Sequence, residues 1–471
     1  MNNDKTREVF ANAPVPKAVL LNVIPSIISM LMVLIYNLAD TFFIGQTKNA
    51  LMVGGVSVAT PAFLLFMSVG MMFGVGGMSF ISRKLGEGDL EIAKKASSFC
   101  FWTGLIIGII SMIVIFVFAQ PICRAIGASD QTIEYASEYL KIVAFGIPFL
   151  ILSNAFSNII RAEGKATVAM LGMIIGNLIN VVLDPIMILG MDMDVAGAAW
   201  ATVLGNVFSA GFYLFHILKN SKILSVKIKD YSAKNSIAVG VLLIGIPASL
   251  NGVLMSLSNV LVNKQMVNYG DMAVAGLGVA MKVNMIVVML LIGLGIGIQP
   301  LLGYCFGARN KKRYMKVLKF SIILAVAISL VMTVICYCGA GFLVKKFLDN
   351  PMAYDYAFEF SRTYIYSGPI MGILFVFINA IQSMGAALPA LILNISRQGL
   401  VYIPIMFIFK AVFDTPRMLA AAQPVTDYCA ATLAMILFFL NYKKYFNRKS
   451  DFNMDSNKNS NAESNMDLPQ N

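Results

Sequence analysis

The sequence has little charge and almost no histidine. Only 13% of its 471 residues are charged and one is histidine, whereas 58% are hydrophobic and the mean hydropathy is +0.77. Soluble domains are about a quarter charged, so this composition excludes a soluble enzyme. The chain also lacks the HExxH pattern of zinc proteases and the P-loop pattern GxxxxGK[ST] of ATP-driven pumps. We therefore expect neither an enzyme nor a bound cofactor.

The six cysteines carry no functional signal. They lie mostly inside apolar runs, without the spacing of a metal site and without histidines to complete one. Cysteines in such surroundings are small buried hydrophobic residues. No redox site is predicted.

Apolar runs of membrane-spanning length follow one another along nearly the whole chain. About 20 apolar residues in a helix cross a bilayer. The pattern predicts twelve spans, at residues 17–45, 53–82, 97–120, 139–160, 168–190, 196–219, 237–269, 273–305, 317–338, 356–382, 387–410 and 424–442. We expect an all-α integral membrane protein, multi-pass in the cell membrane.

The excess of basic residues indicates how the chain is oriented. Lys and Arg outnumber Asp and Glu by 36 to 24, and they gather in alternate loops, such as 83–95, 219–234 and 309–319. Loops rich in Lys and Arg stay on the cytoplasmic side. Both termini should therefore be cytoplasmic. The basic surplus points to anionic membrane lipid as a contact, and no nucleic acid partner is expected.

The sequence repeats itself at an offset of about 221 residues. Gly74, Gly76 and Gly86 recur as Gly295, Gly297 and Gly307. Each copy has six spans, an even number, so the copies share one orientation and form two pseudo-symmetric six-helix bundles, the geometry of alternating access. The expected organisation is an N-terminal cytoplasmic arm (1–16), a first lobe (17–219), a cytoplasmic linker (220–236), a second lobe (237–442) and a disordered cytoplasmic tail (443–471).

Two carboxylates, Asp40 and Asp184, fall clearly inside predicted spans; Asp427 is placed at a span end. A carboxylate within the bilayer is costly, so it indicates a functional site. Both predicted carboxylates lie at a similar depth in the outer half of the membrane. Helical spacing places Tyr36 and Asn37 on the face of Asp40, and Asn177 and Asn180 on the face of Asp184. Ala198 and Thr202, near the outer start of the next span, lie at a comparable depth.

This cluster of carboxylate, amide and hydroxyl groups has no lysine or arginine nearby. Two buried carboxylates without a counter-ion cannot both stay ionised, so the cluster suits a shared proton or a hard monovalent cation such as Na⁺. Pro185 removes a helical hydrogen bond beside it and predicts a hinge. The matching positions of the second repeat are apolar: Val262, Val401 and Ile405. Coupling is therefore expected in the first lobe alone.

Other polar residues within spans have less specific interpretations. Asn154 and Asn158 are candidates for contact with a transported molecule, and a packing role between helices explains them equally well. Lys282 and Arg397, in the second lobe, are interpreted as structural or gating residues.

Several of these segments resemble the multidrug and toxic compound extrusion (MATE) transporters. The segments are YNLADTFFIGQ, RAEGKATVAM, NLINVVLDPIMILG and SRQGLVYIP, in this order, and the resemblance covers about residues 1–442. The chain is most similar to the prokaryotic branch that carries its acidic pair in the first lobe. That resemblance implies a MATE-like fold and the binding of H⁺ or Na⁺ at Asp40, Asn180, Asp184, Ala198 and Thr202.

The resemblance also implies export of organic cations and other amphipathic drugs in exchange for H⁺ or Na⁺. Tyr36, Asn37, Asn154, Asn158 and Asn177 are the candidate drug contacts, and we expect a monomer. A flippase for lipid-linked saccharides is the alternative. It would need a cationic cavity for pyrophosphate, for which the chain offers Lys264, Lys282 and Arg397.

Overall fold

The computed structural model describes residues 8–45, 50–126, 128–191, 193–348 and 350–447, and within these ranges the chain forms helices and no strands. Part of the predicted arm (1–7) and most of the predicted tail (448–471) lie outside the described residues. The first lobe begins after a short π-helix, η1 (Glu8–Asn12). Its long helices are α2 (Val15–Gly45), α3 (Ala50–Glu87), α4 (Leu90–Ile126), α5 (Ile133–Ala162), α6 (Ala166–Pro185) and α7 (Asp194–Asn220).

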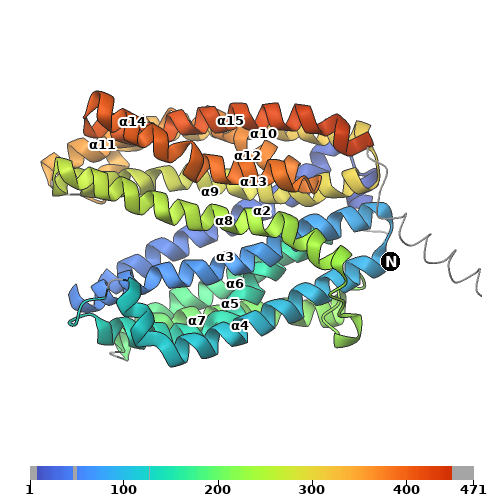
Figure 1. Cartoon of the computed structure of the whole chain (residues 1–471), viewed down its shortest axis with the longest axis horizontal. Helices are drawn as coiled ribbons and strands as arrows, with labels where there is room; N and C mark the ends of the chain where they lie inside the picture. The colour runs from blue at the N-terminus through green and yellow to red at the C-terminus, as the bar shows by residue number, and fades with distance from the viewer. Residues whose placement is uncertain (1–7, 46–49, 127, 192, 349, 448–471) are drawn as a thin grey trace, which may run out of the picture.

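The second lobe has the same number of spans but more interruptions. Its helices are α8 (Asn235–Met266), α9 (Asp271–Gly307), α10 (Lys311–Lys345), α11 (Pro351–Ile365), α12 (Gly368–Ser383), α13 (Ala387–Ile395), α14 (Tyr402–Phe413) and α15 (Pro416–Asn447). Short helical segments lie between the long helices: η2 (Ile186–Gly190) in the first lobe, η3 (Ile228–Asp230) between the lobes, and η4 (Val267–Tyr269) and η5 (Ser396–Leu400) in the second lobe. Figure 1 shows the two lobes as separate layers of helices.

Eleven helical segments of the described chain are long and apolar enough to span a membrane, and a twelfth span results if α11 and α12 are counted as one. The predicted tenth span, 356–382, is therefore not the continuous helix that we expected. It bends by 51° between α11 and α12. Pro369 lies at the start of α12; a proline lacks a backbone N–H and disfavours helical geometry in the residue before it, which breaks the helix there.

The lobes touch through glycines on α3. A Cβ built on Gly76 would lie 2.2 Å from the carbonyl oxygen of Val241 on α8, and one built on Gly245 of α8 would lie 2.2 Å from the carbonyl oxygen of Met72. The hydroxyl of Ser79 donates to the carbonyl of Gln382 at 2.6 Å in the second lobe. Only glycine, which has no side chain, permits the close backbone approach at Gly76 and Gly245.

The internal repeat has a structural counterpart in these contacts. Gly76 packs on α8, and its counterpart Gly297 packs on α2, where an added Cβ would lie 2.8 Å from the carbonyl oxygen of Asn22. Likewise Gly86 abuts the backbone of α9 and Gly307 abuts the backbone of α3. In each lobe the second long helix, α3 or α9, thus packs against the other lobe through equivalent glycines.

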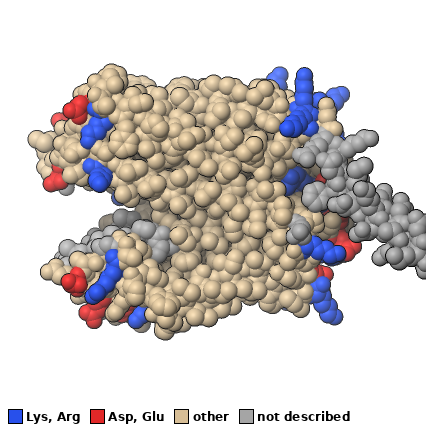
Figure 2. Space-filling view, in the orientation of Figure 1, with Lys and Arg blue, Asp and Glu red and all other residues tan. Residues whose placement is uncertain are grey.

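All these contacts lie toward one end of the molecule, the end at which α2 begins and α7 ends. At the opposite end the lobes diverge, and the space-filling view shows a notch between them (Figure 2). Lys and Arg dominate the end where the lobes touch, whereas acidic and basic residues mix at the notched end (Figure 2). The structure is closed at its basic end.

Candidate functional site

The predicted cluster forms where α6 packs against α7. Asp184 lies in the last turn of α6 and Asn180 one turn earlier, while Ala198 and Thr202 lie near the start of α7. The amide of Asn180 donates to the hydroxyl of Thr202 at 3.3 Å. Spacing of four residues on each helix places these groups on facing sides. The structure therefore brings Asn180 and Thr202 into contact, and Asp184 and Ala198 lie one turn away on the same sides of α6 and α7.

The interior of this cluster is closed to solvent but incompletely hydrogen-bonded. Asp184 is 0% exposed, Asn180 2% and Thr202 6%. Within the described part of the chain, both carboxylate oxygens of Asp184 and the side-chain oxygen of Asn180 have no hydrogen-bond partner. Buried polar atoms are nearly always paired, so these three oxygens are the acceptors in the cluster that are free to take a proton or a cation.

Asp40 approaches the same place from α2, which packs along α6. It is half-buried and is an electrostatic neighbour of Asp184. Tyr36, one helical turn earlier, interacts with Asp40, Thr202 and Asp184. Asp40 and Asp184 thus approach one another from different helices, and a shared coupling role for them stays a prediction.

Tyr139 of α5 lies in the electrostatic environment of these acids, and the sequence analysis did not identify it. Its side chain is an electrostatic neighbour of Asp40, Tyr36 and Asp184. It lies near the start of its span, at the notched end of the lobe. The sequence contains one indication of this position: Tyr139 is near the outer end of its predicted span, at the depth predicted for the two acids.

The donor set of the site fits a proton or a monovalent cation. Carboxylate, amide and hydroxyl oxygens are hard ligands, and Na⁺ can take them from Asp40, Asp184, Asn180 and Thr202. The described residues contain no group of three or more His, Cys, Asp or Glu side chains that could hold a metal ion.

The remaining predicted drug contacts are not all in one place. The amides of Asn154 and Asn158 on α5 donate to the carbonyls of residues four earlier, at 2.9 and 3.0 Å. Both side chains pack against glycines of α3, Gly70 and Gly74. This placement favours the packing interpretation.

Asn177, on α6, is closer to the polar cluster. Its amide nitrogen is buried without a partner among the described residues. Asn37 lies on α2 beside Tyr36. Contact of either residue with a transported molecule stays a prediction.

Pro185 marks a change of helix type. The α-helix α6 ends at Pro185 and continues as the π-helix η2 up to Gly190. A π-helical segment within a span often marks a functional position. The predicted hinge role remains untested, but the irregular hydrogen bonding lies directly beside Asp184.

The second lobe contains a buried ion pair that corrects the placement of Asp427. We expected Asp427 at a span end, but it lies well inside α15 and is 0% exposed. The guanidinium of Arg397, in η5, donates to its carboxylate at 3.2 Å, and Gln423 donates to the same oxygen at 3.2 Å. Arg397 also lies over the ring of Phe375, 4.9 Å from its centroid. The prediction placed Asp427 near a span end because the predicted apolar run begins at residue 424. Helix α15 itself begins earlier, at Pro416.

This pair weakens the flippase alternative. Arg397 is neutralised by Asp427, and Lys282 lies over the ring of Phe347, 5.7 Å from its centroid. A pyrophosphate site needs cations free to donate to it. Arg397, paired with Asp427, is therefore not available to such a site.

Replacing Arg397 by Met should destabilise the protein. The change leaves the Asp427 carboxylate buried without its counter-charge, which costs about 3–5 kcal/mol when one member of a buried pair is removed. Thermal unfolding in detergent should show a clear drop in melting temperature for Arg397→Met. The double variant Arg397→Met/Asp427→Leu should recover most of that loss. Equal melting temperatures for the single and double variants would contradict a paired role.

The fold and site define a polytopic membrane transporter of two repeated lobes. The MatE family model matches the chain twice, at residues 25–186 and 247–408, near the offset at which the sequence repeats itself. The chain belongs to this MATE family. Because the family consists of transporters, its membership supports a transporter and not an enzyme.

Curated relatives match nearly the whole chain. It is 31% identical over 438 residues to the multidrug export protein MepA of Staphylococcus aureus, covering 93% of this chain and 96% of the relative. Identity is also 31% to the MepA of Staphylococcus haemolyticus, over 432 residues, 92% of this chain and 95% of that one.

Solved structures share the fold. One is described as a crystal structure of MATE in complex with MaL6; it has a TM-score of 0.89 and 24% identity, and the match covers 93% of this chain and 98% of that one. Another is described as the outward-facing conformation of a multidrug resistance MATE family transporter, with a TM-score of 0.89 and 24% identity over 94% and 98%. The predicted two-lobe, all-helical MATE-like fold is confirmed.

Proposed function

We propose that the protein exports organic cations and other amphipathic drugs across the cell membrane, in exchange for H⁺ or Na⁺ that moves inward. The observation that carries the coupling step is Asp184, which is fully buried and whose two carboxylate oxygens have no partner among the described residues. The names of the MepA relatives support drugs as the transported molecules.

The coupling follows from the environment of the two acids. Two carboxylates in one buried site repel each other unless a proton or cation lies between them. Binding of H⁺ or Na⁺ therefore draws Asp40 on α2 toward Asp184 on α6. Because α2 also packs along α9 of the second lobe, a bend of α2 changes the space between the lobes. Drug binding between the lobes is thereby weakened, and the drug is released outward.

The energy available for this exchange is sufficient. One elementary charge that moves across 100 mV yields about 2.3 kcal/mol, and a concentration gradient of the ion adds to it. A difference of about 1.4 kcal/mol corresponds to a tenfold concentration ratio. One inward charge can therefore concentrate a neutral drug substantially outside. A monovalent cationic drug carries its own charge outward, so its export draws on the concentration gradient of the ion or on a second inward ion.

The distribution of basic residues supports the orientation. If the basic end faces the cytoplasm, as the positive-inside rule requires, both termini are cytoplasmic and the notch between the lobes opens outward. The glycine contacts of α3 then close the cytoplasmic side. This arrangement is the state from which a drug leaves.

Reconstituted vesicles test the proposal. The purified protein should accumulate or expel a fluorescent organic cation when either a pH gradient or a sodium gradient is imposed, and the effective gradient identifies the coupling ion. Vesicles without protein serve as the control. Equal transport with neither gradient would contradict antiport.

A further inference from the structure

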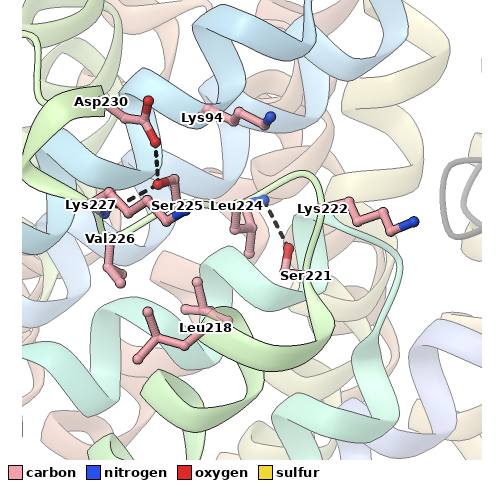
Figure 3. Close-up of a pocket in the computed structure, with 10 residues that line it drawn as sticks. Lys94, Leu218, Ser221, Lys222, Leu224, Ser225, Val226, Lys227 and Asp230 are labelled. Carbon is pink, nitrogen blue, oxygen red and sulfur yellow. Dashed lines mark hydrogen bonds between the residues drawn. The ribbon is translucent and has the colours of Figure 1, made fainter.

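A pocket of about 360 Å³ lies at the basic end of the first lobe, away from the site described above. It is enclosed by the first turns of α4, the last turn of α7 and residues 221–230 of the segment that connects the lobes (Figure 3). Three lysines line it, Lys94 from α4 and Lys222 and Lys227 from the connecting segment.

The wall formed by the connecting segment is held in place by α4. The hydroxyl of Ser97 donates to the carbonyl of Ser225 at 2.9 Å and accepts from its N–H at 2.8 Å. Ser98 donates to the carbonyl of Lys227 at 2.8 Å, and the indole of Trp102 donates to that of Val226 at 3.1 Å. The pocket is therefore preformed and does not depend on a ligand to order it.

The charge of the pocket is positive. Among the described residues, none of the three lysine ammonium groups forms an ion pair, whereas exposed lysines elsewhere at this end, such as Lys84 and Lys95, pair with glutamates. The one acidic side chain in the lining, Asp230, accepts a hydrogen bond from Ser225. Lys94, on α4, and Lys222, on the connecting segment, extend in the same direction (Figure 3). The pocket therefore suits an anion with several acceptor oxygens.

The position of the pocket selects the source of that anion. Helix α7 is a membrane-spanning helix that ends at Asn220, directly at the pocket. Leu218, which lines the pocket, is 58% exposed, and Phe215, three residues earlier on the same helix, is 53% exposed. A phosphate at the lysines would thus have an apolar surface beside it for acyl chains, which a soluble anion lacks.

We propose that this pocket binds the phosphate of an anionic phospholipid. Lys94, Lys222 and Lys227 contact the headgroup, and the acyl chains lie along the exposed face of α7. Basic pockets at the ends of spanning helices are suited to such headgroups. The connecting segment joins the two lobes. The bound lipid therefore holds the first half of this segment on the first lobe.

The test compares two triple variants of the full-length protein in a neutral detergent. Lys94→Gln/Lys222→Gln/Lys227→Gln removes the pocket lysines. Lys312→Gln/Lys316→Gln/Lys319→Gln removes the same charge from exposed positions of α10 at the same end. Binding of fluorescent phosphatidylglycerol is titrated, and circular dichroism and thermal melting verify that both variants fold.

A lysine beside an anionic lipid contributes roughly a fivefold factor in affinity, so loss of three should weaken binding by roughly 100-fold. The α10 variant should bind within about twofold of the unchanged protein if the pocket is the site. Equal loss in both variants would show only diffuse attraction and overturn the proposal. Displacement of the lipid by millimolar glycerol phosphate would overturn it as well, because the headgroup alone would then suffice.

Discussion

Replacing Asp184 by Asn should stop gradient-driven export while the protein stays folded. Asn has nearly the same shape but neither takes up a proton nor supplies a negative charge to a cation. Since the carboxylate oxygens have no partner in the described chain, the change removes no hydrogen bond. Transport in reconstituted vesicles should therefore fall to the rate of protein-free vesicles under both a pH gradient and a sodium gradient.

The same variant should not be less stable, and this distinguishes coupling from a structural role. A buried charge without a partner costs free energy, so neutralising it should leave the melting temperature unchanged or raise it. Arg397→Met predicts the opposite, because it leaves a charge unpaired. Drug binding measured without a gradient should persist.

The matched control is Asp130→Asn, which removes an equal charge from a side chain that is 99% exposed. It should transport as the unchanged protein does. If Asp184→Asn exports the drug normally under either gradient, the coupling site is elsewhere. If it unfolds, Asp184 has a structural role that its unpartnered oxygens do not suggest.

Gly76→Leu should also abolish export, for a steric reason. An added Cβ would lie 2.2 Å from the carbonyl oxygen of Val241, and that neighbour is backbone, which cannot move aside alone. Overpacking of this kind costs about 1–3 kcal/mol. A cost of about 3 kcal/mol reduces the population of the state closed at the basic end by roughly 100-fold relative to the alternative. Transport stalls because one of its two states is lost.

Gly245→Leu should have the same effect, since it lies on the other side of the same contact. Gly211→Leu is the control: it adds the same side chain to a helical glycine that has no heavy atom within 4 Å of an added Cβ. Transport rates in vesicles and the distance between spin labels on the two lobes measure the outcome. Normal export by Gly76→Leu would show that the lobes do not need this contact.

These two experiments separate the ion site from the lobe movement. Asp184→Asn should still allow the lobes to change position, because it leaves the glycine contact intact. Gly76→Leu should still bind the coupling ion, because the site is at the other end of the lobe. A variant that fails in both respects would indicate misfolding.

Much of this protein follows from the sequence because the bilayer restricts what a chain can do. Backbone polar groups have no water partners in hydrocarbon, so apolar runs of about 20 residues must be helices. The repeat then predicts two lobes, and the expense of a buried carboxylate singles out Asp40 and Asp184. Neither inference requires knowledge of how helices pack.

Tertiary structure decided what local patterns do not contain. The sequence could not distinguish packing from binding for Asn154 and Asn158, because their contacts with Gly70 and Gly74 join helices far apart in the chain. The positions of Tyr139 near the two acids and of Asp427 beside Arg397 also depend on contacts between helices that are distant in the sequence. The bend between α11 and α12 and the closure at the basic end depend on which helices meet. The chemistry of a side chain can therefore be read from the sequence, whereas the residues that surround it are decided by how the helices pack.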